Sequence, residues 1–237
     1  MKLREQAYES FRQHLLTNRI RPGQFVSQRE LVALTGLPLG AIREMIPRLE
    51  ADGLIVTIPQ RGMQIASVDL KLVRNAFQLR AILEREAITQ FTLSAGDAEI
   101  ERFVRRHAEI LARAEAGPIT PELLDEAQSL DWGFHDALID RLGNLLVSSV
   151  YRVNSLKIRL IRFEETSLSP AVLLRALHEH TTVLEAVAAR DPVRAVQALD
   201  RHIDSARLRA LGITGKDEHE TAADAVLDAP AVALTGS

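Results

Sequence analysis

The chain contains no cysteine, and aromatic side chains make up only 4% of its 237 residues. The absence of thiols excludes disulfide bonds and thiolate metal sites, and it favours a reducing compartment. No run of about 18 apolar residues occurs, so we expect no membrane-spanning helix. The N-terminal segment carries charges throughout, which is not typical of a secretory signal. These absences predict a soluble, cytoplasmic protein.

The remaining composition is typical of a globular protein, with 46% apolar and 26% charged side chains and a net charge of −3. The charge is unevenly distributed. Residues 1–66 contain nine Lys or Arg against six acids, whereas the rest of the chain contains 20 against 26. A basic N-terminal part on an acidic body is typical of a nucleic-acid-binding module joined to a second domain.

Three short helices are predicted near the N-terminus. Apolar residues at helical spacing indicate the first, over residues 3–17. Ser27 and Glu30 have the spacing of a capping box, which opens a second helix that stops at Gly36. A third helix is expected over residues 38–52, with Pro38 in its first turn, where a missing N–H costs nothing.

A β-hairpin is predicted directly after these helices. Two short β-branched runs, over residues 54–58 and 63–66, flank the turn signal Pro59-Gln60-Arg61-Gly62. Three helices followed by a hairpin is the order of a winged helix-turn-helix. The helix over 38–52 would fit the major groove, and the hairpin tip with Arg61 and Gly62 could reach the DNA backbone or the minor groove. The alternative is a small unit that only caps a larger domain.

The chain from residue 69 to 211 is predicted to form six helices. Several start signals mark them, each an N-cap residue followed by proline: Thr120-Pro121, Ser169-Pro170 and Asp191-Pro192. The expected helices cover residues 69–94, 97–116, 120–141, 143–167, 170–190 and 192–211. The sequence therefore predicts a mostly α protein, with a winged helix-turn-helix over 1–67, an antiparallel all-α bundle over 68–212 and a disordered tail over 213–237.

Four polar residues lie on apolar helix faces of the predicted bundle. Asp131 and His135 are four residues apart and share one face, and His180 and His202 lie on the buried stripes of two further helices. Isolated buried charge is costly, so these groups need partners. A divalent metal ion is the economical partner, with zinc first and nickel or manganese as alternatives. For any one histidine alone, the alternative is a core histidine with a protein partner.

Two further histidines are expected outside this cluster. His178 has Arg175 and Thr181 near it, and His107 follows Arg105 and Arg106 directly. These polar neighbours predict that both imidazoles are exposed to solvent.

Several N-terminal motifs together resemble the DNA-binding domain of the GntR family of bacterial regulators. They are Ile20-Arg21-Pro22-Gly23, Arg29-Glu30-Leu31, Ile42-Arg43-Glu44, Arg48-Leu49-Glu50, Gly53-Leu54 and Arg61-Gly62. The resemblance implies a homodimer that places two recognition helices on a pseudo-palindromic double-stranded operator. It also implies that Arg29, Arg43 and Arg61 contact DNA.

The start of the helix over residues 38–52, the expected recognition helix, departs from the pattern of that family. The family usually has a stretch similar to Ser-Arg-Thr-Pro at the start of this helix, and here it is Pro38-Leu39-Gly40-Ala41. The basic residue and its hydroxyl neighbour are thus replaced by Leu39 and Gly40. Loss of a bidentate base contact costs about 1–3 kcal/mol of discrimination, so we expect an unusual operator or weaker binding.

Four motifs of the C-terminal part resemble the FCD domain, the all-helical effector domain of the FadR-type GntR branch. They are Arg80-Ala81-Ile82-Leu83-Glu84, Asp131-Trp132-Gly133-Phe134-His135, Glu179-His180 and Arg201-His202. Six helices rather than seven resemble the VanR-like subgroup. The resemblance implies that a small carboxylic acid binds at or beside the metal.

Two residues are the candidates for holding such an acid. Arg80 lies among apolar residues of its helix, and a guanidinium binds a carboxylate through two parallel hydrogen bonds. Its alternative is an intrahelical pair with Glu84. Asn154 is the second candidate, with a packing role as its alternative.

The expected function is therefore a ligand-responsive transcriptional regulator, most often a repressor in this family, rather than an enzyme. A metalloenzyme is the competing class, since Asp and His ligands also describe hydrolytic sites. No convincing general base or Gly-rich phosphate loop accompanies the four ligands. A metal-binding bundle of purely structural role, with weak or lost DNA binding, is the other alternative.

Overall fold

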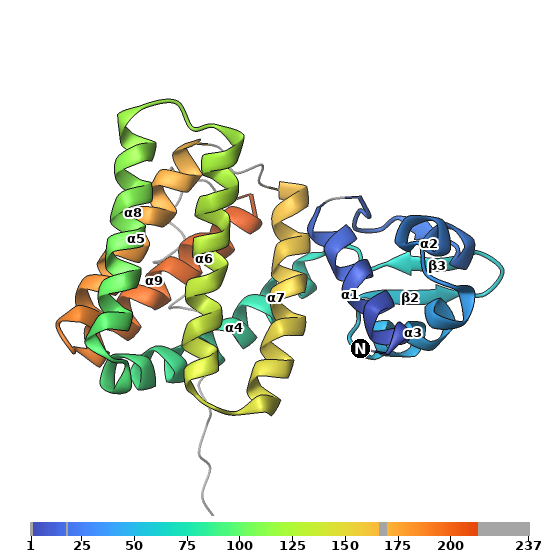
Figure 1. The fold of residues 1–237 in the computed structure, drawn as a ribbon, viewed down its shortest axis with the longest axis horizontal. Helices are drawn as coiled ribbons and strands as arrows, with labels where there is room; N and C mark the ends of the chain where they lie inside the picture. Colours follow the sequence, from blue (N-terminus) through green and yellow to red (C-terminus); the bar gives the residue numbers. More distant parts are fainter. Residues whose placement is uncertain (1, 18, 166–169, 213–237) are drawn as a thin grey trace, which may run out of the picture.

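A small N-terminal unit lies beside a larger helical bundle (Figure 1). The computed structural model describes residues 2–17, 19–165 and 170–212. The expected tail and Ser169 lie outside the described residues. No described helix is long and apolar enough to cross a membrane. The predicted fold, a mostly helical chain with a small antiparallel sheet near its N-terminus, is confirmed.

The N-terminal unit has the predicted order of three helices and a hairpin, with one additional short strand. That strand pairs with the second hairpin strand, so the antiparallel sheet has the order β1-β3-β2. Two residues are too few to give a periodic pattern, so the sequence did not predict β1. The elements are α1 (Leu3–Leu16), β1 (Phe25–Val26), α2 (Gln28–Thr35), α3 (Leu39–Ala51), β2 (Ile55–Ile58) and β3 (Gly62–Ile65).

Capping chemistry fixes the ends of α2 as predicted. The Ser27 hydroxyl accepts from the Glu30 amide at 3.2 Å, and the Ser27 amide donates to the Glu30 carboxylate at 2.6 Å. Gly36 ends the helix in the left-handed region at φ +69°. The expectation for Pro38 was wrong by one position, because it is the extended N-cap before α3 rather than part of the first turn.

The hairpin turn requires glycine at one position. Gln60 has φ +64° and Gly62 has φ +91°. A Cβ atom at Gly62 would lie 3.1 Å from the carbonyl oxygen of Val26. Glycine thus lets the hairpin close against β1, and this packing places Arg61 at the tip.

The bundle contains the six predicted helices, with bounds that differ by at most two residues. Thr120 and Asp191 cap α6 and α9 through their side chains, as their Thr-Pro and Asp-Pro pairs indicated. The bounds are α4 (Leu70–Ser94), α5 (Asp97–Ala116), α6 (Pro121–Arg141), α7 (Leu145–Glu165), α8 (Pro170–Ala188) and α9 (Pro192–Ala210).

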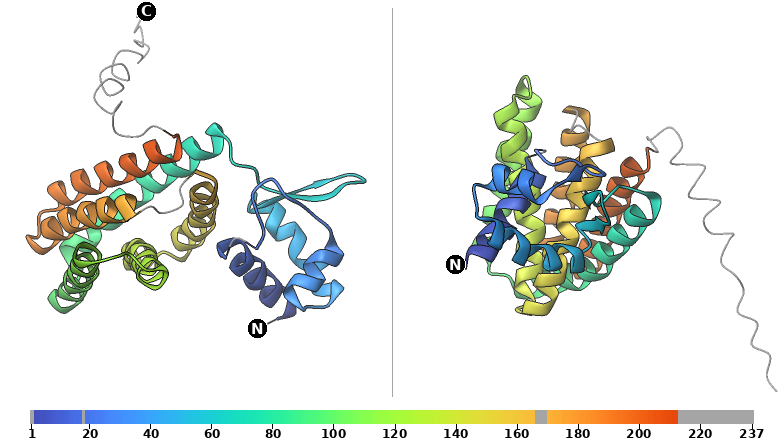
Figure 2. Two further views of the ribbon diagram at one scale, coloured as in Figure 1. Left: turned by 90° about the horizontal axis from the view of Figure 1, so that it is seen from above. Right: turned by 90° about the vertical axis from the view of Figure 1, so that its right-hand side faces the viewer.

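Helix α7 belongs to both units. It is the bundle helix nearest the N-terminal unit, as the two further views show (Figure 2). Leu156 and Leu160 of α7 are buried in the same apolar cluster as Phe11, Leu49 and Ile55 of the N-terminal unit. One helix therefore fills part of the N-terminal core while the rest of it packs on α4 and α6.

Candidate functional site

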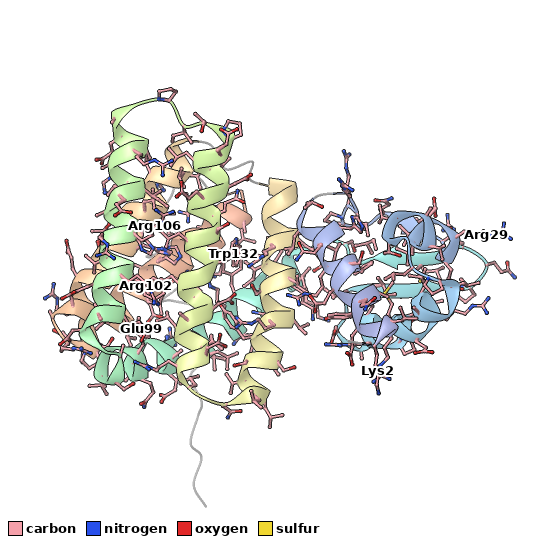
Figure 3. The ribbon with its side chains drawn as sticks, viewed as in Figure 1. Lys2, Arg29, Glu99, Arg102, Arg106 and Trp132 are labelled. Atoms are coloured by element: carbon pink, nitrogen blue, oxygen red, sulfur yellow. The ribbon has the colours of Figure 1, made fainter. Side chains whose placement is uncertain are left out.

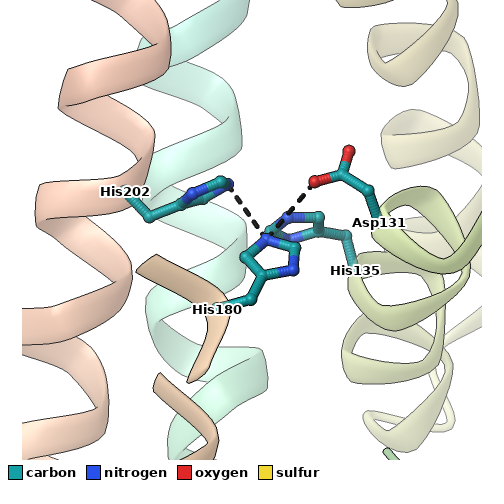
Figure 4. Close-up of side chains that lie close together, drawn as sticks. All are labelled: Asp131, His135, His180 and His202. Carbon is teal, nitrogen blue, oxygen red and sulfur yellow. Dashed lines mark hydrogen bonds and ion pairs between the residues drawn. The ribbon is translucent and has the colours of Figure 1, made fainter. Parts of the chain in front are cut away.

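The four polar residues predicted to bind a metal come together in the centre of the bundle. Asp131 and His135 lie one turn apart on α6, His180 comes from α8 and His202 from α9 (Figure 4). One ligand atom of each lies within 4.8 Å of the others. The imidazoles are buried and Asp131 is partly exposed. Such a donor set is typical of a divalent metal site.

The ε-nitrogens of two of the histidines face each other across the centre. Nε2 of His180 lies 3.3 Å from Oδ1 of Asp131 and 3.2 Å from Nε2 of His202. Burial, followed by the positive charge of neighbouring histidines, lowers the pKa of His180 well below its usual range. Burial also lowers the pKa of His202, against the opposing effect of its carboxylate partner. Both rings are therefore neutral near pH 7, as metal coordination requires.

The δ-nitrogen of each cluster histidine has a partner outside the cluster. Nδ1 of His135 lies 2.8 Å from Glu84, and Nδ1 of His202 lies 2.9 Å from Glu179. Nδ1 of His180 lies 3.1 Å from Nε2 of His107. Histidines that bind metal almost always donate their other ring N–H to such a partner, which orients the ring. The arrangement leaves Nε2 of His180 and of His202 facing the centre of the cluster, whereas Nε2 of His135 lies against Arg80.

Glu84 connects the cluster to its surroundings, a role that the sequence did not reveal. Its carboxylate is fully buried and contacts His135, Nε of Arg80 at 2.8 Å and the hydroxyl of Tyr151 at 2.6 Å. Burial opposes its ionisation, but Arg80 and His135 outweigh burial and hold the pKa of Glu84 at about 2. Glu84 is therefore a buried carboxylate anion whose charge is balanced by a guanidinium.

Arg80 is buried beside the cluster. It forms the intrahelical pair with Glu84 that was the alternative to acid binding, and its Nη2 lies 2.6 Å from Nε2 of His135. The guanidinium thus reaches the centre of the site while one edge is held by a carboxylate. This position is compatible with both of the roles expected for Arg80.

Asn154 is also buried, but its amide group is engaged. Nδ2 donates to the carbonyl oxygen of Ala76 at 2.9 Å, which ties α7 to α4. This contact corresponds to the packing alternative, and acid binding by Asn154 stays a prediction.

The expectation of an exposed His107 was wrong. His107 is 1% exposed, and its ring packs beside the aromatic rings of Phe103 and Phe134. Neighbours in sequence were misleading, because Arg105 and Arg106 point to other sides of the helix. The helical spacing of the apolar residues would have predicted its burial correctly. The buried positions of α5 are Ile100, Phe103, His107, Ile110 and Ala114.

His178 is exposed, as predicted, and pairs with Glu115 at 3.3 Å on the surface.

A shallow recess between α6 and α8 leads to the cluster from outside. Asp131 and His180 are among its lining residues, and apolar residues form most of its walls. The lining residues are Ala127, Gln128, Asp131, Leu173, Ala176, Leu177 and His180. The partly exposed side of the cluster thus faces the surface of the bundle here.

The residues predicted to contact DNA are exposed on the N-terminal unit. Arg29 on α2 projects at the end of the unit farthest from the bundle (Figure 3). Nε of Arg43, on α3, donates to Oε1 of Gln28 at 3.0 Å, so α2 and α3 share a polar surface. Arg61 lies 5.1 Å above the ring of Phe25, beside Gly62 in the wing. Leu39 is 38% exposed at the start of α3.

Comparison with known proteins agrees with this organisation. Residues 3–65 match the family model of bacterial regulatory proteins of the gntR family, and residues 75–205 match the FCD domain. The chain is 27% identical over 199 residues to the HTH-type transcriptional repressor GlaR of Escherichia coli K12, covering 83% of this chain and 90% of that protein. It is 30% identical over 217 residues to an HTH-type transcriptional regulator in an unstable DNA locus of Streptomyces ambofaciens, covering 87% and 86% of the two chains.

The fold also resembles that of solved structures. The structure of E. coli McbR/YncC superimposes with a TM-score of 0.66 at 17% identity, covering 86% of this chain and 94% of that chain. The family matches confirm the expectation of a regulator rather than an enzyme, and the metalloenzyme alternative is thereby set aside. With a gntR-type DNA-binding unit and an FCD domain that together account for most of its length, the chain belongs to the FadR-like branch of the GntR family of bacterial transcriptional regulators.

Proposed function

We propose that this regulator is a metal-dependent repressor whose operator binding is controlled by a small carboxylic acid bound at a divalent metal in the bundle. The observation that carries the proposal is the convergence of Asp131 with three buried imidazoles, each held by an outer partner on its δ-nitrogen. That a relative of this chain, GlaR, is described as a repressor supports the sign of regulation.

The residues present suit such a metal. Asp131, His135, His180 and His202 would supply one oxygen and three nitrogens, which zinc, nickel and manganese all accept. When bound, the ion would supply positive charge and an additional coordination position for a carboxylate. The recess lined by Asp131 and His180 lies at the partly exposed side of the cluster, where an acid would approach it.

Arg80 supports the binding of an acid at the same place. A guanidinium can only donate hydrogen bonds, so the lone pair on Nε2 of His135 accepts from Nη2 of Arg80 at 2.6 Å. Because a metal ion needs that same lone pair, metal binding would release this edge of the guanidinium. The freed N–H groups would then be available to a carboxylate beside the metal. Asn154 would be a second contact if its amide left Ala76.

Helix α7 provides the connection between the two units. Its Tyr151 donates to Glu84, which in turn contacts His135, and five residues later Leu156 enters the N-terminal core. A displacement of Glu84 on ligand binding would therefore be transmitted to α1 and α3 by a single helix. The acid must favour one arrangement of the two units for this coupling to alter DNA affinity.

DNA recognition is assigned to the N-terminal unit. We infer a homodimer on a double-stranded operator, with contacts from Arg29, Arg43 and Arg61 and with Gly62 shaping the wing. The exposed Leu39 and Gly40 offer no hydrogen-bonding side chain at the start of α3, so Arg43 and the wing would carry more of the recognition. The corresponding domains would be residues 1–67 and 68–212, and six bundle helices are consistent with a VanR-like subgroup.

The decisive experiment is fluorescence anisotropy on DNA from upstream of the protein's own gene, with zinc-loaded protein and a panel of small carboxylic acids at fixed salt. One acid is expected to release the DNA. The double variant His180→Ala/His202→Ala should lose zinc and become insensitive to that acid, whereas the surface variant His178→Ala should behave as wild type.

Other outcomes would contradict parts of the proposal. Specific DNA binding that no acid changes would indicate a bundle whose metal has only a structural role. Unchanged zinc content in the double variant would overturn the ligand assignment. Absence of specific DNA binding would indicate that Leu39 and Gly40 mark a lost or displaced recognition surface.

A further inference from the structure

The three histidines of the cluster have different kinds of group at their δ-nitrogens. His135 and His202 face the carboxylates of Glu84 and Glu179. An ionised carboxylate accepts hydrogen bonds and cannot donate them. His180 instead faces another imidazole, that of His107. An imidazole can donate or accept at either nitrogen, so its proton arrangement must be determined by something else.

A backbone carbonyl group determines it. Nδ1 of His107 lies 2.8 Å from the carbonyl oxygen of Phe103, one turn earlier on α5. A carbonyl oxygen only accepts, so the proton of a neutral His107 is on Nδ1 and its Nε2 is an acceptor. The hydrogen bond from His180 must then be donated by its own Nδ1, which leaves the lone pair of His180 on Nε2.

A competing group favours the opposite arrangement. Oδ1 of Asp131 lies 3.3 Å from Nε2 of His180. A carboxylate there would attract the proton of a neutral ring to Nε2, and in that tautomer the nitrogen that faces the cluster has no lone pair for a metal. Nε2 of His202 lies 3.2 Å from the same nitrogen and is also an acceptor, because the Nδ1 of His202 faces Glu179. Three neighbours thus act on the tautomer of His180: His107 favours the form that can bind metal, whereas Asp131 and His202 favour the form that cannot.

We propose that His107 is a positioning residue that holds His180 in the Nδ1-protonated tautomer and so sets the metal affinity of the cluster. The proposal rests on the metal site of the proposed function. His107 itself is not a metal ligand, because its Nδ1 is hydrogen-bonded to the carbonyl oxygen of Phe103 and its Nε2 to His180. Loss of such an outer partner lowers metal affinity by about 10–100-fold.

The test measures the tautomer and the metal affinity separately. Long-range ¹H–¹⁵N spectra of the zinc-free full-length protein should show His107 and His180 both protonated at Nδ1. In His107→Phe, which keeps an aromatic ring beside Phe103 and Phe134, His180 should change to the Nε2-protonated form. Competition with a chromogenic chelator should then give a zinc dissociation constant about 10–100-fold higher.

Two controls separate the hydrogen bond from packing. Phe103→Leu removes an aromatic contact of His107 but keeps the backbone carbonyl, so it should leave the tautomer of His180 unchanged. His178→Ala removes an exposed histidine two residues from His180 and should leave zinc affinity unchanged.

The outcomes are distinguishable. An Nε2-protonated His180 in the zinc-free wild type overturns the inference without any variant. So does a zinc affinity of His107→Phe within about threefold of wild type, or a loss of the tautomer in Phe103→Leu. Failure of the wild type to bind zinc would contradict the metal site itself, whereas the tautomer measurement would still test the role of His107.

Discussion

The two units of this regulator have cores of different character. In the described part of the N-terminal unit the buried side chains are apolar except for the hydroxyl of Tyr8, which donates to Asp52 at 2.6 Å. The bundle contains all of the buried polar and charged residues identified among the described residues. They are Arg80, Glu84, Thr92, His107, His135, Asn154, Ser155, His180 and His202.

The difference agrees with what each unit is proposed to bind. DNA is contacted from the surface, so the N-terminal unit can use an apolar core and place its arginines outside. The small acid of the proposed function would have to be enclosed, which requires charge inside the bundle, and buried charge is stable only when it is paired. The bundle therefore contains a network of paired buried charges, in which removal of one residue leaves another unpaired.

The largest expected effect is a variant that breaks this network. Glu84→Leu removes the partner of Arg80, His135 and Tyr151 together and leaves a buried guanidinium without its carboxylate. We expect the free energy of unfolding to fall by about 3–5 kcal/mol. Urea unfolding followed by fluorescence measures this directly, because Trp132 is the one tryptophan of the chain and lies on α6 in the bundle.

Two matched variants sharpen this prediction. Arg85→Ala breaks the exposed pair with Asp200 and should cost less than about 1 kcal/mol. Combining Glu84→Leu with Arg80→Met removes both buried charges and should recover part of the lost stability. A Glu84→Leu variant no less stable than Arg85→Ala would show that the buried pair contributes nothing to the bundle.

The same contrast explains which features the sequence could predict. Helices, caps and the hairpin depend on local chemistry, so Ser27, Thr120 and Asp191 marked their ends correctly. The spacing of Asp131 and His135 and the apolar stripes around His180 and His202 are also local patterns. All four residues could therefore be placed on inward faces before their distances were known.

Contacts between helices were not predictable in this way. Glu84 was visible as a neighbour of Arg80, but its bonds to His135 on α6 and Tyr151 on α7 depend on tertiary packing. His107 was misjudged because the arginines before it lie on other faces of α5. The entry of Leu156 into the N-terminal core had no signal either, since an apolar stripe does not say which neighbour covers it.

A smaller effect is expected from a change on the surface of the N-terminal unit. Arg43→Ala should weaken operator binding by about 1–3 kcal/mol, because Arg43 is an exposed cation on the recognition helix. The unfolding of the bundle, followed by Trp132, should not change. Anisotropy titrations at fixed salt measure the first quantity, and Arg85→Ala is the control that removes one arginine from the bundle instead. Equal affinities of the two variants would refute a contact by Arg43.

The smallest expected effect is a pH dependence confined to one unit. Burial lowers the pKa of His180 and of His202 in the folded protein, so the unfolded chain binds more protons as the pH falls through the ordinary histidine range, about 6.5. The stability that these neutral rings contribute is complete above that pH and is lost as the pH falls from there toward their folded pKa values. Amide-exchange protection factors of the zinc-free protein should therefore decrease with acidification in α6, α8 and α9.

The protection factors should stay constant in α1 to α3, where the described histidine, His14, is not buried. An equal decrease of the protection factors in both units would mean that acid destabilises the whole chain. The buried histidines of the bundle would then not explain the pH dependence.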